Sequence, residues 1–176
     1  MKKISSLAVV LLSLFSLAAC GGSKSEPAMK VENDSFSLTP QEYIDYVNNL
    51  IEIQDDSSFL TIPDFTESGK TIYIESTHLS LKLTANDGGK LTEIQWHWNA
   101  KKQDTTSNIG FYLGVSILMV SANEDAQGEI VDGLNMFDTT PPEYDTSYTL
   151  DGVLYSYSTY GHGQYNTITI TPTSDS

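Results

Sequence analysis

Apolar side chains first repeat at helical spacing, and this repeat predicts a helix from about Pro40 to Gln54. Its apolar face is formed by Tyr43, Ile44, Val47, Leu50 and Ile51. Thr39 followed by Glu42 is a capping box, and Pro40 suits the first helical position because it lacks the N–H that would go unpaired there. The sequence therefore predicts an amphipathic helix that buries one side.

A period of two follows this helix and predicts strands. Residues 71–76 and 79–84 alternate apolar with polar, and a strand beginning at Leu91 carries Ile94, Trp96 and Trp98 on one side. Residues 86–89 (Asn-Asp-Gly-Gly) form a turn between the last two, so 79–99 is expected to be a hairpin. Leu91 is out of phase with the other apolar positions, which indicates a bulge or a late start of the strand.

Residues 109–120 are apolar all round. As a helix, twelve residues span about 18 Å against about 30 Å of bilayer hydrocarbon, so a buried core helix is favoured over a membrane span. Residues 121–124 (Ser-Ala-Asn-Glu) are expected to cap a further helix that turns Ala126, Ile130, Val131 and Leu134 inward. The two prolines at 141 and 142 end any helix there.

The last third of the chain again has strand spacing. Strands are predicted at 147–150 and 153–158, joined by Asp151-Gly152, and at 165–171. The links between strands are too short for parallel crossovers. The expected fold is α+β: an antiparallel sheet of about six strands, with an N-terminal helix and a central helical pair packed on it. One domain is expected over residues 35–172, with a polar tail at 173–176.

The first twenty residues carry a different pattern. Two lysines are followed by an apolar stretch at 7–15 and then by Leu17-Ala18-Ala19-Cys20. This order resembles the signal and lipobox of bacterial lipoproteins. The resemblance implies that residues 1–19 are removed and that Cys20 is acylated and becomes the new N-terminus. A plain signal peptide with a chance cysteine, or a membrane span, is the alternative. Residues 4–19 are short for a span and contain four serines.

A lipidated Cys20 would anchor the domain to the cell envelope, because several acyl chains hold stably in a bilayer. The residue after the cysteine is Gly21 rather than aspartate. Within the lipoprotein class this implies the outer membrane if the source has one, and otherwise the outer face of the cell membrane. Residues 20–34, rich in Gly, Ser and charge, are expected to be a flexible tether.

Charge excludes some partners. Without residues 1–19 the chain keeps seven lysines, no arginine and all 23 acidic residues, a net charge of −16. Nucleic acid and anionic lipid need a basic surface, so neither is expected to bind directly. An acidic surface favours a cationic partner, although solubility alone also accounts for it. Since Cys20 is the only cysteine, no disulfide within the chain is possible.

No catalytic pattern is present in the sequence. The three histidines, His78, His97 and His162, are far apart and do not have the short spacing of metal ligands. Gly-x-Ser-x-Gly is absent, and carboxylate pairs arise by chance among 23 acidic residues. No catalytic residue, metal or cofactor is therefore predicted.

Aromatic residues give the remaining candidates. Trp96 and Trp98 share one face of a strand and are expected to pack under the apolar helix rather than to be exposed. Five tyrosines near the C-terminal hairpin are candidates for binding a partner: Tyr148, Tyr155, Tyr157, Tyr160 and Tyr165. Tyr155 and Tyr157 lie on the opposite face from Leu154, so they are exposed if Leu154 is in the core.

These observations lead to three expectations of function. The first is a membrane-anchored, non-enzymatic module that binds a protein or a cell-wall component. The second is an inhibitor or immunity-type lipoprotein that neutralises a basic toxic or lytic enzyme, motivated by the net charge. The third is a hydrolase or metal-dependent enzyme.

Overall fold

The computed structural model describes residues 27–54, 58–74, 78–101, 103–121, 123, 125–136 and 144–173. Six antiparallel strands form one sheet in the order β3-β4-β5-β8-β7-β6. The strands are β3 (Thr71–Tyr73), β4 (Leu79–Ala85), β5 (Leu91–Asn99), β6 (Tyr144–Leu150), β7 (Val153–Tyr160) and β8 (Tyr165–Pro172). The helices are α2 (Pro40–Gln54), α3 (Gln103–Val120) and α4 (Ala126–Gly133). The predicted α+β fold with its antiparallel sheet is confirmed.

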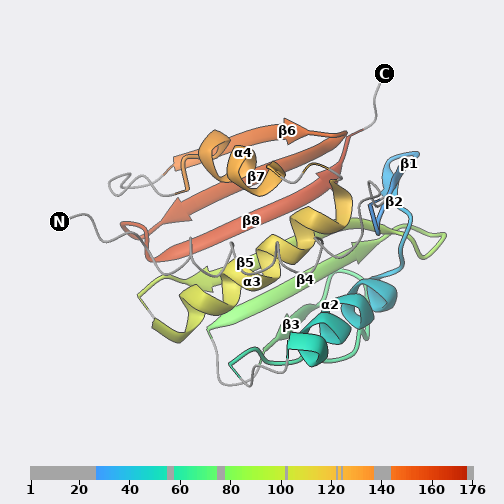
Figure 1. The fold of residues 1–176 in the computed structure, drawn as a ribbon, viewed down its shortest axis with the longest axis horizontal. Helices are drawn as coiled ribbons and strands as arrows, with labels where there is room; N and C mark the ends of the chain where they lie inside the picture. Colours follow the sequence, from blue (N-terminus) through green and yellow to red (C-terminus); the bar gives the residue numbers. More distant parts are fainter. Residues whose placement is uncertain are drawn as a thin grey trace.

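All three described helices lie on one face of the sheet (Figure 1). We call this the covered face, and the opposite one the open face. Alternate residues of each strand therefore face opposite sides of the sheet. In β7, Val153, Tyr155 and Tyr157 are buried, whereas the side chains between them are partly exposed. This alternation is typical of an antiparallel sheet with one solvated face.

Helix α2 begins and ends where the apolar spacing predicts. Its capping box is formed, since the Thr39 N–H donates to Glu42 Oε2 (2.8 Å) and the Glu42 N–H donates to Thr39 Oγ1 (3.3 Å). Hydrogen bonding of the Glu42 carboxylate to the backbone N–H and side chain of Thr39 lowers the pKa of Glu42. Tyr43, Ile44 and Val47 are completely buried against the sheet and α3.

Helix α3 is the buried core helix that its all-round apolar sequence predicts. Tyr112 stacks on Trp96 with ring centroids 4.9 Å apart, and Phe111 stacks on Phe59 at 4.3 Å. Trp96 and Trp98 are both buried beneath the helices, so the expectation for the tryptophans is confirmed. No helix among the described residues is long and apolar enough to cross a bilayer.

Helix α4 buries the four predicted residues Ala126, Ile130, Val131 and Leu134. Its N-cap residue is Asp125, and its side chain makes no capping hydrogen bond. The predicted cap at residues 121–124 is therefore wrong, and the N-cap is the next residue, Asp125. α4 packs closely on β6, because a Cβ added to Gly133 would lie 2.4 Å from the Tyr148 ring. Glycine is required at that contact.

Two strand connections follow the turn chemistry of the sequence. Asp151 (φ 51°) and Gly152 (φ 74°) both have positive φ, as a two-residue type I′ hairpin turn needs. In the β4–β5 hairpin the register shifts beside Leu91, which pairs with Ala85, while Glu93 pairs with Thr84. The bulge predicted from the phase of Leu91 is confirmed.

The N-terminal boundary differs from the expectation. Strand β1 (Val31–Glu32) lies in the stretch predicted as tether, and it forms a small hairpin with β2 (Ser35–Phe36) of the predicted domain. Met29 is completely buried, and its N–H donates to the Met119 carbonyl of α3 (2.7 Å). The packed core thus includes Met29, six residues before the predicted domain start at residue 35, because its side chain fills the core beside α3.

Candidate functional site

The open face of the sheet is the surface that positions polar side chains together. Strand pairing places them in rows, so that His97, Thr167, Ser158 and Asp145 follow one another across β5, β8, β7 and β6. The next row contains Lys82, Gln95, Thr169, Ser156 and Ser147. Hydroxyl and amide groups dominate both rows.

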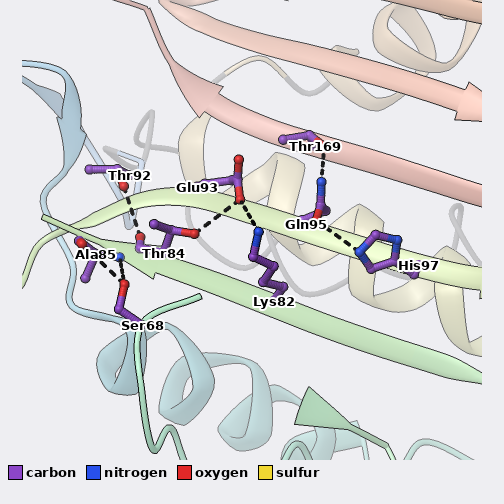
Figure 2. A network of polar contacts seen from close by, with 9 residues as sticks. All are labelled: Ser68, Lys82, Thr84, Ala85, Thr92, Glu93, Gln95, His97 and Thr169. Carbon is purple, nitrogen blue, oxygen red and sulfur yellow. Dashed lines mark hydrogen bonds and ion pairs between the residues drawn. The ribbon is translucent and has the colours of Figure 1, made fainter. Parts of the chain in front are cut away.

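A hydrogen-bonded chain runs along the middle of this face (Figure 2). Gln95 Nε2 donates to Thr169 Oγ1 (3.0 Å), and Gln95 Oε1 lies 3.0 Å from His97 Nε2. His97 Nδ1 lies 2.8 Å from Thr167 Oγ1. Because Gln95 Oε1 can only accept, His97 carries its proton on Nε2, and Nδ1 accepts from the Thr167 hydroxyl. Both ring nitrogens of the neutral imidazole are therefore engaged.

The surroundings of His97 favour its neutral form. Partial burial lowers the pKa of the imidazole, the Lys82 ammonium lowers it further, and Glu93 opposes them. Lys82 and Glu93 themselves form an ion pair with an Nζ–Oε1 distance of 3.5 Å, and Thr84 Oγ1 donates to the same carboxylate oxygen (3.2 Å) (Figure 2). The charges at this point of the open face are thus balanced locally.

A shallow hollow of about 370 Å³ lies on β6, β7 and β8. Seven residues line it, and two of them, Thr146 and Tyr157, have their side chains on the covered face: Asp145, Thr146, Ser147, Ser156, Tyr157, Ser158 and Thr169. Asp145 is the only charged residue in the 23 residues of these three strands. The hollow is therefore neutral apart from one carboxylate at the edge of the sheet.

The five candidate tyrosines do not form one surface. Tyr155 and Tyr157 point to the covered face and are 1% and 6% exposed, whereas Leu154 lies on the open face. Tyr157 donates to Asn166 Oδ1 (2.6 Å) and stacks on Trp98. Tyr155 and Tyr157 were expected to be exposed if Leu154 lay in the core. In the structure Leu154 lies on the open face and the two tyrosines are buried. These two tyrosines are not available to a partner.

The other three tyrosines differ among themselves. Tyr148 is half-buried on the covered face, where its ring lies against Gly133 of α4. Tyr160 and Tyr165 lie at one end of the β7–β8 hairpin, 54% and 42% exposed, and stack with ring centroids 5.1 Å apart. Of the five candidate tyrosines, only this stacked pair is exposed at the surface.

Residue types that bind metal are dispersed over the described part of the chain. No cluster of three or more His, Cys, Asp or Glu residues that could hold a metal ion occurs there. His78 and His162 are exposed on separate loops. Cys20, the predicted lipidation site, lies outside the described residues.

Ser116 of α3 is completely buried in the core, and no sequence pattern pointed to it. It donates to the Tyr112 carbonyl (2.7 Å) and accepts from the Tyr43 hydroxyl (2.7 Å) and from Trp96 Nε1 (3.3 Å). All its hydrogen-bonding capacity is used within the core, so it joins α2, α3 and β5 and is not free to act as a nucleophile. Burial raises the pKa of Tyr43 to about 12.

Sequence reasoning did not find the polar network on the open face. The alternation of His97 and Gln95 with the tryptophans was the available signal, but it does not say which strand lies beside β5. That neighbour is β8, which is distant in sequence. Comparison of the chain with protein-family models, with curated proteins and with solved structures found no match.

Proposed function

We propose that this chain is a membrane-anchored, non-enzymatic binding module that engages an envelope protein or a cell-wall component through the open face of its sheet. The observation that carries the proposal is the location of all three helices on one side. No described helix covers the other side (Figure 1), and the strand register places hydroxyl and amide side chains of β5, β7 and β8 there. Surfaces of this kind bind through many weak polar contacts and an aromatic anchor, here Tyr160 and Tyr165.

The state of the polar groups supports binding over catalysis. Both nitrogens of His97 are engaged by neighbouring side chains, and Ser116 is saturated in the core. A general base needs a hydrogen-bonding site that can face a substrate. The open face instead offers pre-positioned donors and acceptors, which is what recognition of a polar partner requires.

The experiment is site-specific photocrosslinking in the native envelope. A photoreactive amino acid is placed at Ser156, in the middle of the open face, and in a matched variant at Ile53, which is 64% exposed on α2. We expect a discrete crosslinked partner from position 156 and none from position 53. Equal crosslinking from both positions, or none from position 156, would remove the open face as the binding surface.

Anchoring is tested separately, because it rests on the lipobox resemblance. In a Cys20→Ser variant the acyl chains have no attachment point, and we expect the protein to leave the membrane fraction. Unchanged sedimentation with membranes would contradict lipid anchoring at this residue.

Inhibition of a basic lytic enzyme is the second candidate function. The net charge of −16 after removal of residues 1–19 supports it, because such a field accelerates the encounter with a cationic protein and weakens in salt. We would measure the activity of a basic lysozyme against the chain at low and at high salt. Inhibition that disappears in salt would favour this candidate, and no inhibition at either salt would dismiss it for that enzyme.

A further inference from the structure

We propose that the outer edge of β6 binds an extended, lysine-rich segment of a partner protein as an added strand. The inference rests on the proposed function and deepens it, since it names the class of partner and the mode of binding. It starts from the sheet order, in which β6 is the terminal strand and no other described strand pairs with its outer side (Figure 1).

The hairpin turn determines which backbone groups of β6 face outward. The Asp151-Gly152 turn makes Leu150 and Val153 the hydrogen-bonded pair that closes it. In an antiparallel ladder such pairs alternate with non-bonded ones, so the residues of β6 bonded to β7 are every second one from Leu150. The N–H and C=O groups of the residues between them, Asp145, Ser147 and Thr149, therefore point away from the sheet.

This edge lacks the usual protection against pairing. Natural edge strands are shortened, bulged or covered, or carry proline or charged residues, above all lysine, and the only charged residue of β6 is Asp145. β6 has seven residues in regular register with β7 and contains neither lysine nor proline. The opposite edge, β3, has only three residues. Strand addition uses such an unprotected row of backbone donors and acceptors.

Charge indicates the composition of the incoming strand. Asp145, Ser147 and Thr149 are exposed and their side chains lie on the open face, where Asp145 and Ser147 line the hollow. Residues opposite one another in a pair share a face, so alternate side chains of an added strand would stand beside them. Asp145 is the only charge there, and the whole chain is strongly acidic. Lysine at these positions is complementary, whereas a second copy of the chain would be repelled.

The test uses the full chain in detergent and synthetic peptides of seven residues, the length of β6. The probe alternates lysine and threonine, and a control alternates glutamate and threonine. Binding is followed by titration, and backbone amide exchange is measured by NMR. We expect the lysine peptide to bind and to slow exchange at Asp145, Ser147 and Thr149, and the glutamate peptide to leave these amides unchanged.

Two peptide controls separate strand addition from general attraction. In an antiparallel pairing with β6, lysine side chains on the open face mean that the lysine N–H groups point at β6. N-methylation of the lysine backbone nitrogens should therefore abolish binding, whereas N-methylation of the threonines should preserve it. Because the protein is unchanged, this comparison does not depend on the folding of any variant.

Two protein variants complete the test. Ser147→Pro removes an outward N–H without removing a bond to β7, and we expect at least about fivefold weaker binding. Asp145→Asn should weaken binding of the lysine peptide by about twofold to fivefold, the range expected for loss of an exposed ion pair. Unaltered far-ultraviolet circular dichroism would verify the fold of both.

The possible results of these experiments distinguish between different occupants of the β6 edge. Equal binding of the two N-methylated peptides would overturn strand addition in favour of diffuse charge attraction. Protection of the same amides without peptide, accompanied by dimerisation in sedimentation, would assign the edge to a second copy. Binding of a cell-wall oligosaccharide at the hollow, with no peptide binding, would assign it to a glycan. A crosslink from position 156 together with peptide failure would overturn the edge-strand inference and leave the proposed function standing. Loss of both would overturn both.

Discussion

The covered and open faces of the sheet are built by the same strands, yet polar atoms near the covered face are buried and those on the open face are accessible to water. On the covered face Ser116 meets Tyr43 and Trp96 from two other elements, and water has no access. On the open face Gln95 and His97 are hydrogen-bonded to each other, and a water molecule can replace either partner in this bond. The covered face therefore determines stability, whereas the open face can change its side chains without unfolding the protein.

The largest expected effect compares neighbouring residues of β7. Tyr155→Ala removes a fully buried ring, and we expect the free energy of unfolding to fall by about 3–5 kcal/mol. Leu154→Ala acts on the open face and should cost less than about 1 kcal/mol. Urea denaturation of both variants measures the difference. A larger loss for Leu154→Ala would mean that β7 has the opposite face inward.

The next comparison concerns two serines. Ser116→Ala leaves the Tyr43 hydroxyl and Trp96 Nε1 without their acceptor, so a loss of about 2–4 kcal/mol in unfolding free energy is expected. Ser156→Ala on the open face should stay within about 0.5 kcal/mol.

A double variant identifies the cause of that loss. Tyr43→Phe added to Ser116→Ala removes one of the stranded donors, and the combined loss should be smaller than the sum of the two single losses. Additive losses would show that Ser116 matters for packing and not for its hydrogen bonds.

The covered face was largely predictable from the sequence, and the reason is periodicity. A buried face forces apolar residues to every second position of β4 and to the helical spacing of α2, so both elements were found with their inward residues. Turn chemistry gave the β6–β7 hairpin as well, because Asp151 and Gly152 suit a turn that needs positive φ. These are local signals.

The open face was not predictable in the same way. Tyrosine suits either side of a strand, so alternation alone could not decide between Leu154 and the Tyr155–Tyr157 pair. The contact of His97 with Thr167 joins strands that are 70 residues apart, and nothing local encodes it. Met29 was missed for a related reason, since the few apolar residues around it, Ala28 and Val31, make a stretch too short to show a period.

A smaller effect is expected at the ion pair of the open face. Lys82→Ala, Glu93→Ala and the double variant form a thermodynamic cycle around the 3.5 Å contact. Both side chains are about one-third exposed, so a coupling of about 0.2–1 kcal/mol is expected, falling with added salt. Equilibrium unfolding at low and high salt measures it. Coupling that persists unchanged in high salt would show that this part of the face is shielded from solvent.

The smallest expected effect is a dependence of stability on pH at His97. Its pKa is lowered in the folded state by partial burial and by Lys82, so below the ordinary value of 6.5 the unfolded chain binds more protons than the folded one. Stability should therefore fall as the pH falls from 6.5 towards the folded pKa, and should level off below it. In His97→Gln this contribution is absent, so the difference in unfolding free energy between the two proteins isolates it from other titrating groups. Because the ring is only half-buried, solvent screens the effect and keeps it small. A difference that is flat across this range, or that rises towards acid pH, would mean that the imidazole is not held neutral and that water or Glu93 dominates the middle of the open face.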